Sequence, residues 1–415
     1  MAEQRITTDT PFPKQYAREV LTLKKGKGSY VKDTEGRRYL DFGAGIAVNA
    51  LGYGRRDLAR SAARQMRRLI HVSNLYTTEP TLEFARRILE SAREAVGGDY
   101  QAVHFGNSGT EANEAALKYA RLYAATRDGE HHRFLSFSHG FHGRTMGGLS
   151  VTANQKHRKK FEPLIPGCEY APYNDVEALE STLDGRFAAV IVEAVQGEGG
   201  LTTMTEEFAQ ALNRLCAEHD VLLIADEVQT GLGRTGTLFG SERVGLKPDI
   251  ITLSKPLGGG LPLSATVLPG KVNDRLELGD HGTTFGGGPV TTGVGLRVWE
   301  RISQPKFLEE VRGKADHLER RLGELQSRFP FIEQIKGAGM LRGLALHAPA
   351  DRVGEIMKSA LKHARERGLL VLKSGDNVIR IAPPLVITQK ELDRGCEMLA
   401  DTLSYLQNHY EGALA

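Results

Sequence analysis

The sequence predicts an α/β protein with a large, mostly parallel sheet and a small α+β domain toward its C-terminal end. Two apolar runs, Val221–Ala225 and Ile250–Leu253, are short, continuous and rich in β-branched residues, which is typical of strands buried on both faces of a parallel sheet. Strand-like and helix-like stretches alternate on either side of them. The 415 residues are enough for about two to three domain-sized units.

The composition is that of an ordinary globular protein, with 40% hydrophobic and 25% charged residues. The net charge of +3 is small, and the basic clusters Arg64–Arg68 and His157–Lys160 are short. We interpret these clusters as solvated helix faces and expect no nucleic-acid partner.

The three cysteines, Cys168, Cys216 and Cys396, are odd in number and widely spaced. This pattern is typical of reduced thiols in a cytosolic protein. The N-terminus has no apolar signal-peptide core, and no stretch approaches membrane-spanning length. We therefore expect a cytoplasmic protein without a membrane partner.

The N-terminal part combines an irregular segment, a hairpin and two helices. Residues 1–30 are expected to be irregular, and Tyr16 within them is either a packing residue or part of a lid. Gly28–Phe42 predicts a β-hairpin around an Asp-Thr-Glu-Gly turn. Helical periodicity then extends over Arg56–Ile70 and Thr81–Ala95.

A possible phosphate site follows the strand that begins near Tyr100. The strand leads into the tight loop GNSG and a long amphipathic helix that begins near Thr110. Free backbone N–H groups at a helix N-terminus bind anions, and Ser108 and Thr110 add hydroxyl donors. The alternative is that Ser108 only caps the helix, with Glu111 three residues on; one helix end can serve both purposes.

The next two strands also end in polar residues. Arg133–Phe137 leads into SHGFHGRT, where Phe141 could stack on a flat ring and Arg144 could bind a carboxylate. His139 and His142 lack a third ligand at a recognisable spacing, so we expect no metal site.

The strand Ala188–Val192 runs into Glu193 and then into QGEGG. Glu198 in that glycine-rich segment is either a movable carboxylate in the site or a solvent-facing loop acid.

The two central apolar runs each end in a charge, Asp226 after the first and Lys255 after the second. In open α/β sheets the C-terminal strand ends form the ligand crevice. An amine and a carboxylate at one crevice suggest pyridoxal phosphate, because the lysine can form a Schiff base with its aldehyde and the carboxylate can keep its ring nitrogen protonated. The alternative is a pair of solvated loop residues. Pro256 favours extended backbone at Lys255.

The C-terminal part begins after the glycine-rich loop 281–289. Helical periodicity covers Gly293–Ile302 and Lys306–Phe329. Strand and helix patterns then alternate, and Arg380 lies between apolar neighbours, which predicts an acidic partner or a bound anion. These elements are Gly339–Leu346, Arg352–Glu366, Leu369–Leu372, Val378–Ala382 and Gln389–Asn408.

Taken together, these segments resemble the class III (subgroup II) pyridoxal-phosphate aminotransferases of fold type I, over nearly the whole chain. Within that family, IAVNALG, IHVSNLYTTEP and FHGRTMGGLSVT are most similar to the acetylornithine aminotransferases. The resemblance implies an N-terminal arm with part of the small domain (1–60), a large cofactor domain (61–300) and a C-terminal small domain (301–415). The eight markers are YLDFGAGIAVNALG, NSGTEANEAALKYAR, FHGRT, VEAVQGEGG, LLIADEVQTGLGRTG, ITLSKPLGGGLP, HGTTFGG and RIAPPLV.

The resemblance also implies roles at the cofactor. Lys255 would form the Schiff base and move the substrate's α-proton, and Asp226 would pair with the ring nitrogen. Gln229 would bond the ring hydroxyl, and Phe141 would stack on the ring. The phosphate would be held by a group of hydroxyl and backbone donors, with Thr284 supplied by the partner subunit of a homodimer: Ser108, Gly109, Thr110 and Thr284.

On the substrate side, Arg144 and Arg380 would bind carboxylates, with Tyr16 and Thr283 nearby. Glu198 would mask Arg380 while the amino donor is bound and swing away when glutamate needs that arginine. Two segments depart from the family pattern: the usual GGNP is GGGP at Gly288, and the usual histidine-rich GHxHP is GYGRRD over Gly52–Asp57.

The resemblance therefore implies an aminotransferase that moves the terminal amino group of an N-acylated ornithine-like donor to 2-oxoglutarate. Ornithine, 4-aminobutyrate, succinylornithine and aminoadipate-pathway lysine are alternative donors. An aminomutase or racemase on the same scaffold is a further alternative, and so is a binding protein that has kept the fold without catalysis.

Overall fold

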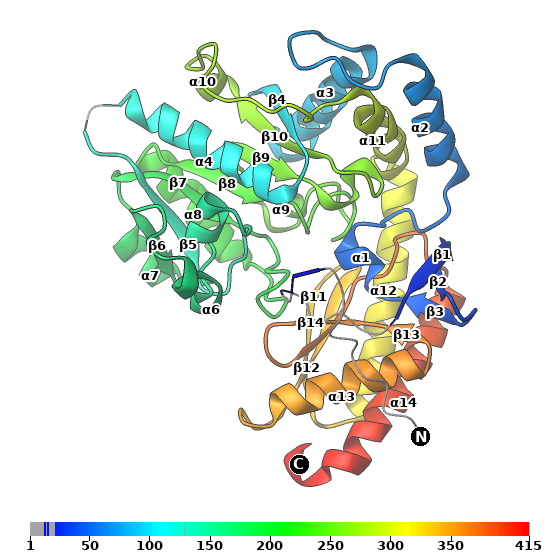
Figure 1. Cartoon of the computed structure of the whole chain (residues 1–415). Coiled ribbons are helices and arrows are strands. Elements are labelled where there is room, and N and C mark those ends of the chain that lie inside the picture. Colours follow the sequence, from blue (N-terminus) through cyan, green and yellow to red (C-terminus); the bar gives the residue numbers. More distant parts are fainter. Residues whose placement is uncertain (1–11, 14, 16–20, 128, 415) are drawn as a thin grey trace.

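The computed structural model describes residues 12, 13, 15, 21–127 and 129–414. Its largest element is a seven-stranded sheet with helices on both faces, and two four-stranded sheets lie at the other end of the molecule (Figure 1). The long helix α12 (Pro305–Arg328) lies between the large sheet and the C-terminal helices. This arrangement is the α/β fold that the sequence predicts.

The large sheet has the strand order β4-β10-β9-β8-β7-β5-β6. β10 pairs antiparallel with both of its neighbours. The other pairs are parallel, as the apolar runs predicted. The strands are β4 (Tyr100–Gly106), β5 (Arg133–Phe137), β6 (Cys168–Ala171), β7 (Phe187–Val192), β8 (Leu222–Asp226), β9 (Ile250–Leu253) and β10 (Ser264–Pro269).

Both faces of this sheet are buried, and successive residues of its strands point to opposite sides. In β8, Leu222 and Ile224 pack in the cluster that includes alanines of helix α4 (Gly109–Ala125). Leu223 and Ala225 pack instead with residues of α7 (Val176–Thr182) and α8 (Glu206–Glu218). Double burial explains why these strands are continuous apolar runs in the sequence.

The first small sheet has the order β1-β2-β3-β13 and joins strands from the N-terminal and C-terminal parts of the chain. The predicted hairpin forms as β2 (Tyr30–Asp33) and β3 (Arg38–Asp41). The expectation of irregular structure up to residue 30 is wrong for β1 (Leu23–Lys27), whose mostly exposed residues give no alternating apolar signal. β13 (Leu369–Leu370) pairs in parallel with β3.

The second small sheet has the antiparallel order β11-β12-β15-β14. β11 (Ile332–Ala338) was not predicted, because most of its side chains are at least partly exposed and give no alternating apolar pattern. The predicted strands near Leu346, Leu372 and Ile381 are present. Their bounds are β12 (Leu341–Leu346), β14 (Leu372–Ser374) and β15 (Val378–Ile381).

The predicted long helices are present, and most of their ends differ from the predicted ends by a few residues. The larger difference is at the C-terminal helix, which continues past the predicted end at Asn408 to Leu414. The helices are α2 (Arg56–Arg68), α3 (Glu79–Ala92), α11 (Pro289–Ile302), α13 (Val353–Glu366) and α14 (Gln389–Leu414). The shorter helices are α1 (Ala44–Ala47), η1 (Arg93–Gly97), α5 (Met146–Ser150), α6 (Gln155–Arg158), η2 (Lys159–Phe161), α9 (Gly240–Val244), η3 (Lys255–Gly258) and α10 (Gly270–Asn273). Within the described residues, no helix is both long and apolar enough to cross a bilayer. The division of the chain into three domain segments stays a prediction.

Candidate active site

A cavity of about 560 Å³ lies where β8 and β9 end. Its wall includes Asp226 from the end of β8 and Lys255 from the turn after β9. The strand ends, the N-terminus of α4 and the loop after β5 all reach it. The structure therefore brings the predicted amine and carboxylate to one crevice at the C-terminal ends of parallel strands.

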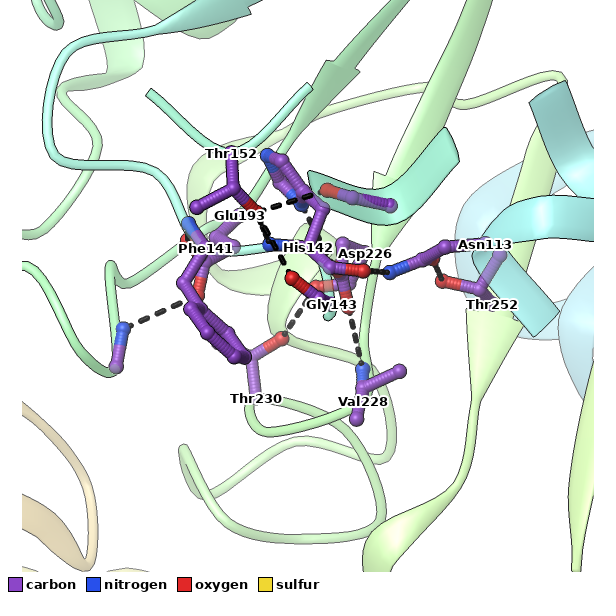
Figure 2. A network of polar contacts seen from close by, with 12 residues as sticks. Asn113, Phe141, His142, Gly143, Thr152, Glu193, Asp226, Val228, Thr230 and Thr252 are labelled. Atoms are coloured by element: carbon purple, nitrogen blue, oxygen red, sulfur yellow. Dashed lines mark hydrogen bonds and ion pairs between the residues drawn. The ribbon is translucent and has the colours of Figure 1, made fainter. Parts of the chain in front are cut away.

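The Asp226 carboxylate is held by three donors (Figure 2). Its Oδ2 accepts a hydrogen bond from Asn113 Nδ2 at 2.8 Å and lies 2.8 Å from His142 Nδ1. Its Oδ1 accepts from the backbone N–H of Val228 at 3.1 Å. The side chain is buried, and these contacts fix its direction in the cavity wall.

Asn113 is itself fixed by a chain of hydrogen bonds. Its Nδ2 also donates to the carbonyl of His142 at 2.8 Å, and its Oδ1 accepts from Thr252 Oγ1 at 2.8 Å. All of these groups are buried. A fully satisfied polar network of this kind is rigid, because each member has a single favourable orientation.

A second buried carboxylate lies close to this network. Glu193 accepts from the backbone N–H groups of Phe141 and Gly197 at 3.0 and 3.1 Å. Burial raises the pKa of Glu193. Burial disfavours the charged imidazole of His142, but its hydrogen bond with Asp226 and the two nearby carboxylates outweigh that effect and raise its pKa. Asp226 therefore favours the protonated form of His142.

Lys255 is partly buried in the cavity wall and opens the short helix η3. Its φ angle is 29°, so the expectation of extended backbone before Pro256 is wrong. A non-glycine residue in this region is strained, and such strain is concentrated at functional sites. Burial lowers the pKa of the amine, opposed by the charges of Glu198 and Asp226.

The loop before α4 forms the opposite wall, with Ser108, Gly109 and Thr110 all lining the cavity. The Ser108 side chain accepts from the backbone N–H of Glu111 at 3.4 Å, so the predicted N-cap is present. The Glu111 carboxylate bonds the backbone N–H of Asn107 at 2.8 Å. A side chain at Gly109 would lie 2.6 Å from Val228, so this position requires glycine. These features fit an anion at the helix N-terminus.

Phe141 and Arg144 lie at the cavity wall beyond β5. The Arg144 guanidinium lies 5.4 Å from the centre of the Phe141 ring. Its Nη2 is 3.3 Å from Nε2 of His157. Arg144 is exposed, and it has no ion pair within the described part of the chain, which leaves its charge available to an anionic ligand.

Arg380 in β15 has the acidic partner that its apolar neighbours predicted. Its Nη1 lies 2.5 Å from Glu198 Oε1, 3.0 Å from the carbonyl of Gly197 and 3.3 Å from Gln229 Oε1. The Arg380 side chain is 4% exposed and that of Glu198 is 34% exposed. Gln229 also lines the cavity. Its side chain therefore lies between the cavity and the Arg380–Glu198 ion pair.

Two of the predicted site residues lie on a loop away from the cavity. Thr283 and Thr284 belong to the loop 281–289 and do not line the cavity of their own chain. The carbonyl of Thr283 accepts from Asn74 Nδ2 at 2.9 Å, and Thr284 is exposed. Tyr16 lies outside the described residues.

Two side chains that hold Asp226, those of Asn113 and His142, were not predicted as site residues. His142 was considered only as a metal ligand, although it follows a strand that ends at the same rim. Asn113 had a usable signal, because it is a polar residue on the alanine-rich face of α4 that packs on the sheet. Within the described residues, no cluster of His, Cys, Asp or Glu is arranged to hold a metal ion.

Comparison with known proteins identifies the family. A family model described as aminotransferase class-III matches residues 12–403, which is nearly the whole chain. The chain belongs to the class-III aminotransferases. Members of this family are enzymes that use pyridoxal 5′-phosphate, so this chain is a pyridoxal-phosphate-dependent aminotransferase.

Curated and solved relatives resemble this class-III aminotransferase along most of its length. It is 46% identical over 382 residues to a probable mitochondrial acetylornithine aminotransferase of Dictyostelium discoideum, covering 90% of this chain and 82% of that protein. It is 42% identical over 408 residues to an acetylornithine aminotransferase of Caldanaerobacter subterraneus, covering 98% and 99%. A solved ornithine aminotransferase of Toxoplasma gondii with pyridoxal phosphate at its active site has a TM-score of 0.88 and 30% identity, covering 96% and 93%.

The residues of the cavity fit this cofactor. An amine, an oriented carboxylate and free backbone N–H groups line one space, as an aldehyde, a ring nitrogen and a phosphate require. Gly143 supports the phosphate end of this fit, because a Cβ at that position would lie 2.1 Å from Thr110 Oγ1. The aminotransferase therefore has a site whose shape and charge match pyridoxal phosphate.

Proposed function

We propose that this aminotransferase moves the terminal amino group of N2-acetylornithine to 2-oxoglutarate, giving N-acetylglutamate 5-semialdehyde and glutamate, a reaction of arginine biosynthesis. The observation that carries the proposal is the buried Arg380 paired with the partly exposed Glu198, beside a cavity that also has Arg144, which forms no ion pair with any residue that the structure describes. The names and identities of the two acetylornithine aminotransferases support the choice of donor.

The number of carboxylates explains why two arginines suit this pair of substrates. 2-Oxoglutarate and glutamate carry two carboxylates, whereas N2-acetylornithine carries one. We assign Arg144 to the carboxylate that both substrates have, and Arg380 to the second carboxylate of glutamate. With the donor bound, Glu198 neutralises Arg380, because an unpaired buried guanidinium is unfavourable.

At the cofactor, we assign Lys255 to the aldehyde, Asp226 to the ring nitrogen and Gln229 to the ring hydroxyl. Ser108, Gly109 and Thr110 would bind the phosphate, and Phe141 would stack on the ring.

When bound, pyridoxal phosphate supplies an electron sink that stabilises negative charge next to the amino group. The Lys255 amine would move the proton at the amine-bearing carbon of the substrate, and its lowered pKa favours the neutral, basic form.

We also propose a homodimer in which each subunit completes the other's site. Exposed apolar side chains surround the loop that carries Thr283 and Thr284, and they include Ile70, Leu75 and Phe285. Their exposed fractions are 60%, 86% and 67%. Exposed apolar groups gathered in this way are typical of a protein interface. In the dimer, Thr284 would reach the partner's phosphate site and Thr283 the partner's substrate.

For the compartment, we propose the cytoplasm. Cys168, Cys216 and Cys396 are all free thiols in the structure. Burial raises the pKa of the Cys168 thiol to about 11, which makes it unreactive as expected of a structural thiol. Cell fractionation tests the assignment; enrichment with an organelle would contradict it.

Separate half-reactions test the proposed activity. The purified enzyme with lysine-bound cofactor is mixed with N2-acetylornithine, ornithine, 4-aminobutyrate or glutamate, and conversion to the pyridoxamine form is followed by absorbance. Fast conversion with N2-acetylornithine and glutamate, and slow conversion with the other two, is the expected result. Fast conversion with glutamate and another donor would replace the substrate. Turnover without 2-oxoglutarate would indicate an aminomutase.

A further inference from the structure

Helix α2 carries an unusual concentration of unpaired positive charge. Its 13 residues include five arginines and a single acid, Asp57, which pairs with Arg55 at 2.5 Å. Within the described residues, Arg60, Arg64, Arg67 and Arg68 have no ion-pair partner. Several arginines on other exposed helix faces of this chain pair with an acid one turn away, as in Arg87–Glu83, Arg320–Glu324 and Arg394–Glu397.

These arginines line a concave surface rather than a convex helix face. A groove of about 940 Å³ lies between α2 and α11, which supplies Arg297 and Arg301 to the opposite wall. Seven arginines and two acids, Asp57 and Glu300, line it, which gives a net charge of +5. The arginines of α11 have acidic neighbours, with Arg297 2.6 Å from Glu300 and Arg301 3.8 Å from Glu310.

Helix electrostatics explain only part of this arrangement. Arg67 and Arg68 lie in the last turn of α2, where the helix dipole favours positive charge. Arg60 and Arg64 lie one turn apart in the middle of the helix, where two like charges repel each other. An anion that bridges the two side chains would remove that repulsion.

We propose that this groove binds a small molecule with several linked phosphates, such as a nucleoside triphosphate or inorganic triphosphate. Guanidinium groups bind phosphate oxygens through paired N–H donors, and arginines on two facing helices can contact successive phosphates. The volume is that of an ordinary small-molecule site. The groove shares no lining residue with the active-site cavity, so the ligand can bind while pyridoxal phosphate is in place.

The net positive charge of the groove comes mainly from the arginines of α2. Arg55 and Asp57 line one end of the groove and form an ion pair at 2.5 Å, so together they add no net charge. The Ser61 hydroxyl donates to the carbonyl of Gly293 at 2.9 Å, which joins the two helices beneath the arginines.

The test measures binding to the enzyme loaded with pyridoxal phosphate. Inorganic triphosphate and ATP are titrated by calorimetry into the unaltered enzyme and into an Arg60→Gln/Arg64→Gln variant. The matched control, Arg320→Gln/Arg394→Gln, removes the same charge from arginines that have acidic partners. We expect the groove variant to bind about tenfold more weakly or worse, the control to bind normally, and cofactor absorbance to stay unchanged in all three.

Three results would overturn the proposal: no binding by the unaltered enzyme, equal weakening in the two variants, or displacement of pyridoxal phosphate by the triphosphates. Equal affinity for ATP and inorganic triphosphate would show that the phosphates alone are recognised. Tighter ATP binding would show that the nucleoside also contacts the groove. Binding should weaken as salt is added, because the contacts are between charges.

Discussion

The direction of the Asp226 carboxylate is set by residues on three separate elements: Asn113 on α4, His142 after β5 and Val228 after β8. The side chain is therefore held in one direction although it is buried. The hydrogen bond with Asp226 and the nearby carboxylates raise the pKa of His142 although burial opposes this, which favours a positive charge beside the carboxylate.

Replacing Asp226 with Ala should leave some bound cofactor but reduce turnover by roughly a hundredfold or more. Without the carboxylate, the ring nitrogen loses its proton and the cofactor withdraws electrons poorly. Steady-state rates at saturating cofactor measure the loss, and Asp226→Asn, which keeps the shape, should be nearly as slow. Turnover of Asp226→Ala close to that of the unaltered enzyme would exclude the ring-nitrogen assignment.

Replacing Arg380 with Ala should slow the glutamate half-reaction roughly a hundredfold, and the N2-acetylornithine half-reaction much less. The donor has no second carboxylate for Arg380, so it loses little. Single-turnover absorbance changes measure each half-reaction. Arg144→Ala is the matched control and should slow both, because both substrates have the carboxylate assigned to it. Equal damage by Arg380→Ala to both half-reactions would contradict the switch role of Glu198.

The contact between Arg144 and His157 predicts a pH effect on substrate binding. A guanidinium has only donors, so His157 must be neutral to accept from it. Burial and the charge of Arg144 lower the His157 pKa; Lys156 adds to this, and Glu198 opposes it. Because its pKa is lowered from the ordinary value of about 6.5, His157 should become protonated only at pH values below that, where it would repel Arg144 and raise KM for the donor.

The variant His157→Gln keeps a hydrogen-bond acceptor but has no titratable group. Its KM for the donor should therefore stay constant over the pH range in which KM rises for the unaltered enzyme. Initial rates measured from pH 5 to 8, roughly the range in which histidine changes charge, give both profiles. Parallel profiles for the two proteins would assign the pH effect to another group.

At the scale of elements, the cavity depends on how closely α4 approaches the loop after β5. Gly143 has a φ of 139°, and a Cβ there would lie 2.1 Å from Thr110 Oγ1. The two hydroxyls of Thr110 and Thr145 lie 2.7 Å apart at the same contact. Any side chain at residue 143 must therefore displace Thr110 at the N-terminus of α4 or the loop after β5.

The variant Gly143→Ala should consequently lose pyridoxal phosphate at least about tenfold faster than the unaltered enzyme, since one charge-assisted phosphate contact has about that value. Dialysis followed by cofactor absorbance measures the loss. Gly245→Ala is the control, because Gly245 also has a positive φ of 68° but has no atom within 4 Å of the added Cβ. A similar rate of loss in both variants would show that backbone strain, rather than the contact with Thr110, is responsible.

At the scale of the whole molecule, Thr284 distinguishes a shared site from a self-contained one. Mixed dimers formed from Lys255→Ala and Thr284→Ala subunits test this. In a shared arrangement, the Lys255 of one subunit meets the intact Thr284 of the other, so one complete site forms in each mixed dimer. Co-expressed subunits should then show about half of normal activity per mixed dimer.

The two parent variants, purified separately, are the controls, and both should be impaired. A mixed dimer no more active than the average of its parents would place Thr284 in the site of its own subunit. Failure of the subunits to associate at micromolar concentration in gel filtration would exclude the dimer itself.

Much of the fold was predictable because double burial leaves a strong local signal. The strands β5, β8 and β9 and the helix α4 follow from apolar runs and helical periodicity. β1 and β11 were not predicted because their mostly exposed side chains carry no such pattern. Backbone pairing with β2 and β12, respectively, holds these two strands in place. β10 was missed although its residues are all buried, since a short apolar run after glycines does not show with which strands it pairs.

The sequence by itself determined the chemistry of the site, because Lys255, Asp226 and the loop before α4 each follow a strand whose end faces the same rim. Only the tertiary structure decided what surrounds those groups. Asn113 and His142 are 29 residues apart, yet both reach Asp226, and Glu198 reaches Arg380 over 182 residues. Such pairs depend on strand order and on the packing of α4 against the sheet, which local sequence patterns do not encode.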